Sequence, residues 1–354
     1  MMSPALRALA TTVVLALVVA PAPGARVAQD AARFDAVVQP FAASGRFMGA
    51  ALVARGDEIV FSKAYGKANV EWDIPNDPST KFRIGSITKQ FTAALILLLE
   101  QDGTLSIQDP LGRHLPGAPE AWKDVTLFHL LTHTSGIVNF TALPDYRTRQ
   151  VQPTTPAEEL ERLRDEPLDF PPGSNYRYSN SGYLVLGHVI ERLTGRPYAQ
   201  VLSERILGPL GMTSSGYDSN AEIVVHRASG YTVGPDGPRN APFVHMTVPH
   251  AAGALYSTTG DLHRWTRALH GGRVLSADSF RKMTTANRNN YGLGLTVRDV
   301  DGRRLIGHGG SINGFNGFVG YYPDSETTVV VLANVAGSAQ QVATALGSAL
   351  GAGR

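Results

Sequence analysis

Cysteine is absent from this 354-residue chain. Its absence excludes a disulfide framework, a thiol nucleophile, a cysteine metal site and a lipidated cysteine. An excess of either charge is also absent, because 32 Lys and Arg residues stand against 30 Asp and Glu residues for a net charge of +2. This balance shows no nucleic-acid-binding footprint. Stability must therefore come from core packing, which this length and a hydrophobic content of 43% can supply.

Motifs of several common enzyme classes are missing as well. No Gly-x-Ser-x-Gly is present, which excludes the nucleophile elbow of an α/β-hydrolase, and no Gly-x-x-x-x-Gly-Lys-Ser/Thr is present, which excludes a P-loop. His129 and His133 are four residues apart, but Leu130 stands where a zinc-protease motif requires Glu. We therefore expect no metal and no organic cofactor.

An apolar run near the amino terminus is too short to span a bilayer. Residues 8–20 follow the positively charged Arg7, and Ala22 and Gly24 offer cleavage positions. We predict that residues 1–25 are a signal peptide and that the mature protein is secreted or periplasmic, without a stable membrane span. An uncleaved membrane anchor is the alternative.

Strand patterns lie at both ends of the chain, and helical patterns lie between them. Predicted strands cover 47–53, 58–64, 68–72, 304–311, 317–322 and 327–334. Predicted helices cover 30–41, 86–101, 125–131, 157–164, 183–193, 198–207, 262–269 and 339–350. We predict an α+β fold with an antiparallel sheet from both chain ends, flanked by helices. Residues 26–85 and 252–354 would form this domain, and residues 86–251 a mostly helical insertion, with the active site at their interface.

The stretch around Ser86 carries the first chemical signal. A β-like run ends at Gly85, Ser86 follows, and Lys89 comes three residues later, beside the most apolar segment of the mature chain. On a helix the two side chains share a face, and an amine beside a hydroxyl is the minimum for an activated serine nucleophile. Helix capping is the ordinary role of serine at such a position, and these residues alone leave both interpretations open.

A second Ser-x-x-Lys runs from Ser279 to Lys282. It lies in a polar, basic stretch, so we expect its lysine to be solvated and its serine to be unactivated. Chance matches to so short a motif are common, and the surroundings must decide between the two copies.

Two further elements lie far from Ser86 in the sequence. Tyr178 and Asn180 present a phenol and an amide from a loop rich in Pro and Gly, although starting the next helix is the ordinary role for Asn180. His308-Gly309-Gly310 lies on a predicted strand, where glycines indicate either the close approach of a ligand or a bulge or crowding in the core.

Together these elements resemble the serine β-lactamase and penicillin-binding-protein superfamily. The resemblance is strongest to the branch that holds class C β-lactamases, D-Ala-D-Ala carboxypeptidases, D-aminopeptidases and related esterases. It covers nearly all of the mature chain and implies a β-lactamase/transpeptidase-like fold. The matching segments are Ser86-x-x-Lys89, Tyr178-x-Asn180, His308-Gly309-Gly310, 130–137 and 251–258.

The resemblance implies roles for individual residues. Ser86 would be acylated, and Lys89 and Tyr178 would share its proton, with either of them as the base. Tyr178 would activate the deacylating water, because the Glu-x-x-Leu-Asn loop of class A is absent. The backbone N–H groups of Ser86 and Ser311 would form the oxyanion hole. Substrate binding would fall to Asn180, His308, Gly309 and Gly310.

The third motif departs from the class C pattern. His308 stands where class C enzymes have lysine, and histidine is mostly neutral at pH 7, so the site offers no permanent charge to a substrate carboxylate. The resemblance therefore implies an exported serine hydrolase for ester or amide bonds, similar to a D-alanyl carboxypeptidase, an aminopeptidase or an esterase. A weak β-lactamase and a penicillin-binding sensor that acylates without turnover are alternatives. We expect a monomer acting on a small-molecule or peptide substrate, such as one derived from the cell wall.

Overall fold

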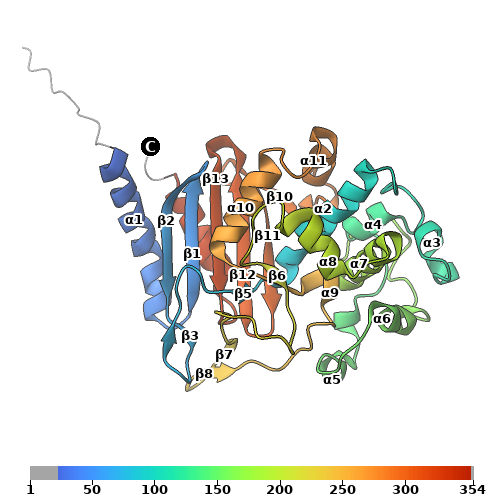
Figure 1. The fold of residues 1–354 in the computed structure, drawn as a ribbon, viewed down its shortest axis with the longest axis horizontal. Coiled ribbons are helices and arrows are strands. Elements are labelled where there is room, and N and C mark those ends of the chain that lie inside the picture. The colour runs from blue at the N-terminus through green and yellow to red at the C-terminus, as the bar shows by residue number, and fades with distance from the viewer. Residues whose placement is uncertain (1–22, 352–354) are drawn as a thin grey trace, which may run out of the picture.

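An antiparallel six-stranded sheet forms one side of the molecule (Figure 1). The computed structural model describes residues 23–351, so the predicted signal peptide lies outside the described residues except for positions 23–25. The strands are β1 (Gly49–Arg55), β2 (Glu58–Tyr65), β10 (Thr296–Val300), β11 (Arg303–Ile312), β12 (Phe315–Tyr322) and β13 (Thr327–Ala333). Their order is β10-β11-β12-β13-β1-β2, with every neighbouring pair antiparallel. The predicted α+β fold, with one sheet from both chain ends, is confirmed.

Both faces of this sheet are covered by helices. Because successive side chains of a strand point to opposite faces, Val53 of β1 joins one core layer and Leu52 joins the other. Helices α1 (Pro23–Ala43) and α12 (Ala339–Ala349) pack on the first face, where Phe34 lies in the core. Helix α10 (Thr259–His270) packs on the second face. Every residue of β13 is buried as a result.

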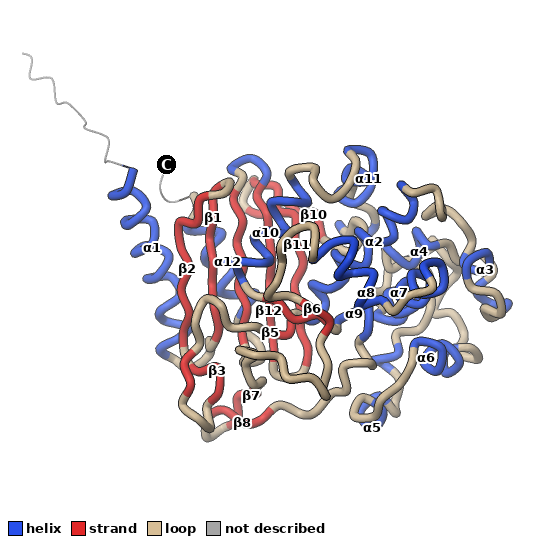
Figure 2. The backbone as a smooth tube through the Cα atoms, in the orientation of Figure 1, coloured by secondary structure: helices blue, strands red, loops and turns tan. Residues whose placement is uncertain are grey.

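Helices and loops make up most of the other side of the molecule (Figure 2). The helices are α2 (Thr88–Gln101), α3 (Leu111–His114), α4 (Leu127–Leu131), α5 (Tyr146–Arg149), α6 (Pro156–Leu163), α7 (Asn180–Thr194), α8 (Tyr198–Leu202), α9 (His250–Gly253) and α11 (Ala277–Thr284). Side-chain caps begin several of them, as at α4, where the Thr126 hydroxyl accepts from the His129 backbone N–H. The Thr258 hydroxyl likewise accepts from Asp261 N–H at the start of α10, at the capping spacing seen in the sequence.

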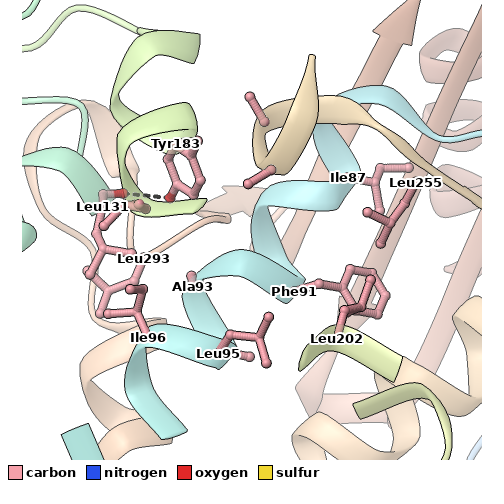
Figure 3. Close-up of a cluster of buried hydrophobic side chains, with 14 of the residues drawn as sticks. Ile87, Phe91, Ala93, Leu95, Ile96, Leu131, Tyr183, Leu202, Leu255 and Leu293 are labelled. Carbon is pink, nitrogen blue, oxygen red and sulfur yellow. Dashed lines mark hydrogen bonds between the residues drawn. The ribbon is translucent and has the colours of Figure 1, made fainter. Parts of the chain in front are cut away.

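Helix α2 is buried among segments from distant parts of the chain, with Leu131 and Tyr183 on one side of it and Leu202 and Leu255 on the other (Figure 3). All residues from Thr88 to Leu99 are buried, and the Phe91 ring stacks on Trp265 at 4.2 Å between centroids. Apolar side chains therefore surround the helix on nearly every side, as its sequence indicated. The helix begins two residues later than predicted, because Gly85–Ile87 forms a 3-10 turn before it.

Three small sheets complete the fold. Their strands are β3 (Lys67–Asn69) with β4 (Ile74–Pro75), β5 (Phe82–Arg83) with β9 (Leu255–Ser257) and β6 (Gly216–Tyr217), and β7 (Tyr231–Gly234) with β8 (Gly237–Asn240). The predicted strand at 68–72 is wrong beyond Asn69. The Asn69 side chain accepts a hydrogen bond from Trp72 N–H at 2.7 Å, and Asp73 has a φ of 53°, which turns the chain back into β4.

No helix described between residues 23 and 351 combines the length and the apolar character needed to cross a bilayer. The division into a sheet domain and an inserted helical domain at residues 85/86 and 251/252 stays a prediction.

Candidate active site

Gly85 sets the position of Ser86. It has a φ of 49°, a backbone conformation that favours glycine, and a Cβ added there would lie 2.8 Å from the Ser311 backbone nitrogen. The chain can therefore turn tightly against β11 and present Ser86 at the start of the turn that leads into α2. Lys89 follows one turn later, and its amine lies 3.1 Å from the Ser86 hydroxyl.

The Lys89 side chain is fully buried, with an exposed fraction of 0%. Besides Ser86, its Nζ lies 2.8 Å from Asn180 Oδ1 and 2.8 Å from the Ala252 carbonyl oxygen. No carboxylate is among these contacts, and burial holds the pKa of Lys89 well below its usual value. The amine is therefore poised to be neutral at a pH where an exposed lysine is charged.

The second Ser-x-x-Lys has the opposite environment. Lys282 forms ion pairs with Glu100 at 2.9 Å and with Asp278 at 3.2 Å, and the hydrogen bond to Glu100 raises the pKa of Lys282. Lys282 is thus partly exposed to solvent, as predicted, and is also held in ion pairs with two carboxylates. Ser279 is buried and bonds to Ser276. A charged lysine cannot accept a proton from a serine, so only the Ser86 copy has the arrangement of a nucleophile and its base.

Tyr178 lies beside the amine, as the sequence predicted. The Lys89 Nζ is 4.8 Å from the centroid of the Tyr178 ring. Burial raises the pKa of Tyr178, and interaction with the Ser86 hydroxyl partly opposes that rise. Its hydroxyl is buried and makes no hydrogen bond of good geometry with the described residues. Tyr178 is therefore a neutral phenol whose O–H is available for proton transfer.

Asn180 begins α7 and lines the cavity that contains Ser86. Its Nδ2 donates to the Thr141 hydroxyl at 3.3 Å, which leaves Oδ1 as the acceptor that faces Lys89. Its backbone N–H donates to Asn139 Oδ1 at 3.1 Å. The side chain is thus held by both ends of its amide.

His308 is buried on β11, and it is uncharged. The Tyr291 hydroxyl lies 2.9 Å from His308 Nε2, and the His308 Nδ1–H donates to the Gly309 carbonyl. Burial lowers the pKa of His308 to about 4. The position that carries a lysine in class C enzymes therefore holds a neutral imidazole with both of its nitrogens already bonded.

The two glycines after His308 differ in what surrounds them. A Cβ added at Gly310 would lie only 1.9 Å from the Ile84 carbonyl oxygen, so β11 passes directly against the residues before Ser86. A Cβ added at Gly309 would lie 3.4 Å from the Gln340 side chain, which is close to ordinary contact. Ser311 follows and is exposed in the same cavity as Ser86. The two backbone N–H groups predicted for the oxyanion hole thus belong to residues that share one cavity.

This cavity has a volume of about 410 Å³ and lies between β11 and the start of α7. Its apolar wall includes Phe140, Tyr146, Val244 and Ile312. Among the described residues that line it, none is Asp, Glu, Lys, Arg or His. Its lining is therefore neutral.

Several residues of the site were missed by the sequence. Thr141 lies in a short 3-10 turn and Tyr291 in a loop, both without a recognisable motif, and Ala252 contributes only its backbone carbonyl. His133 was examined only as a metal ligand, although its imidazole ring lies 4.2 Å from the Tyr178 ring. The usable signals were the segments 130–137 and 251–258, which match the superfamily and contain His133 and Ala252.

His129 and His133 do not form a metal pair. His129 Nδ1 accepts from the Thr126 backbone N–H, and His133 Nδ1 accepts from the Ser179 backbone N–H. Within residues 23–351, no group of His, Asp or Glu side chains is arranged to hold a metal ion.

Comparisons with known proteins agree with this geometry. The family model described as Beta-lactamase matches residues 34–353. The putative penicillin-binding protein PbpX of Bacillus subtilis (strain 168) is 30% identical over 302 residues, which cover 83% of this chain and 72% of that protein. A solved penicillin-binding protein from Bacillus halodurans superposes with a TM-score of 0.79 at 28% identity, covering 90% of this chain and 99% of that one. A D-stereospecific amidohydrolase from a Streptomyces species has a TM-score of 0.75 at 25% identity, covering 88% of this chain and 97% of that one.

The fold and the matches define an enzyme, a serine hydrolase of α+β architecture. The chain belongs to the Beta-lactamase family, and its relatives include penicillin-binding proteins and a D-stereospecific amidohydrolase. The resemblance seen in the sequence is confirmed.

Proposed function

We propose that this enzyme hydrolyses uncharged ester or amide substrates through an acyl-enzyme on Ser86, with Lys89 as the base for acylation. The observation that carries the proposal is the set of partners around the Lys89 amine. A neutral amine has two N–H donors and one lone pair. The Asn180 and Ala252 oxygens accept the two N–H groups, which leaves the lone pair for the Ser86 O–H.

The acylation step follows from this arrangement. Ser86 Oγ attacks the substrate carbonyl carbon while its proton passes to Lys89, and the carbonyl oxygen becomes an oxyanion facing the N–H groups of Ser86 and Ser311. When the intermediate collapses, the leaving group takes the Tyr178 proton and Tyr178 takes one from Lys89. The products are a neutral leaving group, a Ser86 ester, a neutral lysine and a neutral phenol.

Deacylation reverses these transfers with water in place of the leaving group. Water attacks the Ser86 ester, gives its proton to Tyr178, and Tyr178 passes its own proton to Lys89. Ser86 Oγ then leaves and takes the proton from Lys89, which restores the starting state. In this step Tyr178 contacts the water, which is the role that the superfamily resemblance implies for it.

The neutral lining of the cavity supports an uncharged substrate. A carboxylate held there would lose solvation without gaining an opposite charge, which costs several kcal/mol in an apolar site. His308 does not supply the missing charge, because its pKa is lowered and both nitrogens are bonded. Esters and amides that carry apolar acyl groups fit the wall of aromatic and aliphatic side chains best.

A D-alanyl carboxypeptidase, a weak β-lactamase and a sensor that acylates without turnover would each handle a substrate that carries a carboxylate. They are therefore the alternatives that an experiment must separate from an esterase or amidase. Export to the periplasm or beyond, inferred from residues 1–25, is part of the proposal.

The test compares two matched esters in the wild type and in Ser86→Ala. 4-Nitrophenyl butanoate and mono-4-nitrophenyl succinate differ by a carboxylate in place of a methyl group. We expect kcat/KM to be at least about 10-fold higher for the butanoate, and no turnover of either by Ser86→Ala. Equal rates on both esters would contradict the uncharged substrate, and turnover by Ser86→Ala would contradict the nucleophile. A labelled penicillin and a D-Ala-D-Ala peptide complete the panel, in which stable labelling without turnover indicates a sensor.

A further inference from the structure

We propose that His133 is a positioning residue that holds Tyr178 in register for proton transfer. The inference rests on the proposed function, because the placement of Tyr178 matters for catalysis only if Ser86 is acylated. It assigns a task to the segment 130–137, which matches the superfamily but contributes no side chain to the cavity around Ser86.

His133 bonds to the backbone on both sides of Tyr178. Its carbonyl oxygen accepts from the Arg177 N–H at 3.0 Å, and its side-chain Nδ1 accepts from the Ser179 N–H at 3.2 Å. His133 therefore accepts hydrogen bonds from the backbone N–H groups of both residues that flank Tyr178. Rotation of the Tyr178 backbone would break one or both of these bonds.

The imidazole also supports the Tyr178 ring directly. The two ring centroids lie 4.2 Å apart with 39° between the planes. Tyr291 and Tyr183 contact the other sides of the imidazole, with centroids at 4.6 Å and 5.2 Å. His133 is only 1% exposed, so its ring is fixed by packing and cannot swing away from Tyr178.

The tautomer of His133 follows from these contacts. Nδ1 accepts a hydrogen bond, so the proton of the neutral ring is on Nε2, which is buried and has no partner among the described residues. Burial keeps the pKa of His133 well below its usual value. A protonated ring would carry N–H on Nδ1 and would lose the bond to Ser179, so the neutral state is the one that holds the loop.

Few other contacts fix the position of the Tyr178 side chain. The Tyr178 hydroxyl makes no hydrogen bond of good geometry with the described residues, so the position of its oxygen depends on the backbone and on ring packing. The segment that carries His133 is itself tied to this loop, because Thr134 O accepts from Gly173 N–H at 2.8 Å and Ile137 O accepts from the Ser179 hydroxyl at 3.0 Å. A displacement of about 1 Å in a proton-transfer group can cost about 100-fold in rate.

The backbone of His133 allows a sharp set of variants. Its φ of 58° lies in the left-handed region, which Gly adopts freely and Asn tolerates well. His133→Gly keeps the backbone but removes the acceptor and the ring. His133→Asn keeps an acceptor at the place of Nδ1. His133→Gln carries the same amide one bond farther out, away from the place of Nδ1, and replaces the Gly variant if that protein does not fold.

The experiment measures acylation with ethyl butanoate and 4-nitrophenyl butanoate, which share one acyl group. The nitrophenolate leaves as a stable anion, whereas the ethoxide must be protonated, in our mechanism by Tyr178. Both esters give the same butanoyl-enzyme, so we compare kcat/KM, which reports acylation alone. We expect His133→Gly to lower kcat/KM for the ethyl ester at least about 10-fold more than kcat/KM for the nitrophenyl ester. His133→Asn should recover most of this loss.

A double-mutant cycle with Tyr178→Phe separates positioning from general destabilisation. We expect His133→Gly to add less than about twofold to the loss in Tyr178→Phe, because the two residues act as one unit. An equal loss on both esters, no recovery in His133→Asn, or fully additive effects would each overturn the inference. His226 is exposed, also has a positive φ, and provides the control substitution His226→Gly. Turnover by Ser86→Ala would instead show that the proposed function has failed.

Discussion

Two serines in this chain precede a lysine by three residues, and their surroundings differ in the property that decides reactivity. Lys89 loses contact with water and has no carboxylate among its hydrogen-bond partners, so its pKa is lowered. Lys282 is bonded to Glu100, so its pKa is raised. The residues of the motif are the same, and the charge state of the amine is set by what packs around it.

The first prediction at this scale compares the two lysines. Lys89→Ala should lower kcat/KM for 4-nitrophenyl butanoate by about 10³-fold, because Ser86 loses its base. Lys282→Ala should stay within about twofold of the wild type, since Lys282 lies in an ion pair outside the site. The two rates are measured on proteins with matched circular dichroism spectra. A large loss in Lys282→Ala, or a small one in Lys89→Ala, would mean that the wrong motif was chosen.

The second prediction concerns the charge of His308. With a pKa of about 4, the imidazole is about one-tenth protonated at pH 5 and neutral at pH 8. A D-Ala-D-Ala peptide keeps its carboxylate over this range, so its inhibition constant against the nitrophenyl ester should change less than about twofold between pH 8 and pH 5. Binding that tightens about 10-fold toward pH 5 would reveal a histidine that becomes charged and binds the carboxylate.

At the scale of elements, the site depends on how closely β11 approaches the turn before α2. Gly310 faces the Ile84 carbonyl oxygen across a gap that leaves no room for a methyl group, whereas Gly309 has ordinary space around it. Strand β11 therefore helps to form the proposed oxyanion hole in two ways. It carries the Ser311 N–H, and Gly310 lets it lie close to the turn that carries Ser86. Of the two neighbouring glycines, only one has a steric reason to be glycine.

Alanine substitutions test this distinction. Gly310→Ala should push β11 away from Ser86, lower kcat at least about 100-fold and destabilise the fold by about 1–3 kcal/mol. Gly309→Ala should keep kcat within about threefold, because its methyl group reaches only the flexible end of Gln340. Rates and urea unfolding midpoints are measured for both. Equal behaviour of the two variants would contradict the role given to the approach of β11.

The helices and strands could be predicted only in part from the sequence. Strands β1, β2, β11, β12 and β13 have strong apolar patterns and were predicted within two residues of their observed ends. Strand β10 was missed because Thr296–Val300 is a sheet-edge segment with two exposed charged residues, and such a strand has no apolar alternation to detect. Helix α7 begins at Asn180, three residues before the predicted start, because small polar residues at its amino terminus pack against neighbouring segments.

At the scale of the whole molecule, buried histidines set the response to acid. Burial lowers the pKa of His308 to about 4 and of His250 to about 3, and it lowers that of His133 as well. In the unfolded chain these groups have a pKa near 6.5. Between pH 6.5 and 4 the unfolded state therefore binds protons that the folded state does not, and stability falls as the pH falls.

We expect the free energy of unfolding to decrease from pH 7 to pH 5, with each fully buried histidine contributing on the order of 2 kcal/mol. Glu191, whose pKa is raised by burial, acts in the opposite sense and offsets part of this loss. Urea unfolding at the two pH values measures the change, and His250→Gln should make it smaller. A stability that is equal or higher at pH 5 would show that these histidines are protonated in the folded protein.

The predicted site residues lie around one cavity and the buried Lys89 amine beside it. They could be predicted because their side-chain types carry the chemistry of the site. The features of the site that could not be predicted were missed for physical reasons. The Ala252 carbonyl that binds Lys89 is a backbone group, and any residue type could supply it. Tyr291 reaches His308 from a loop that no periodicity describes. The neutral lining of the cavity depends on segments far apart in the sequence, so only the folded chain could reveal it.

The central claim is that Ser86 carries the acyl group during turnover. The most direct measurement is mass spectrometry of the enzyme quenched in acid during hydrolysis of 4-nitrophenyl butanoate, followed by peptide mapping. The account predicts the mass of one butanoyl group on the peptide that contains Ser86 and no adduct in Ser86→Ala. An adduct on another residue, or turnover by the wild type and Ser86→Ala at equal rates, would contradict it.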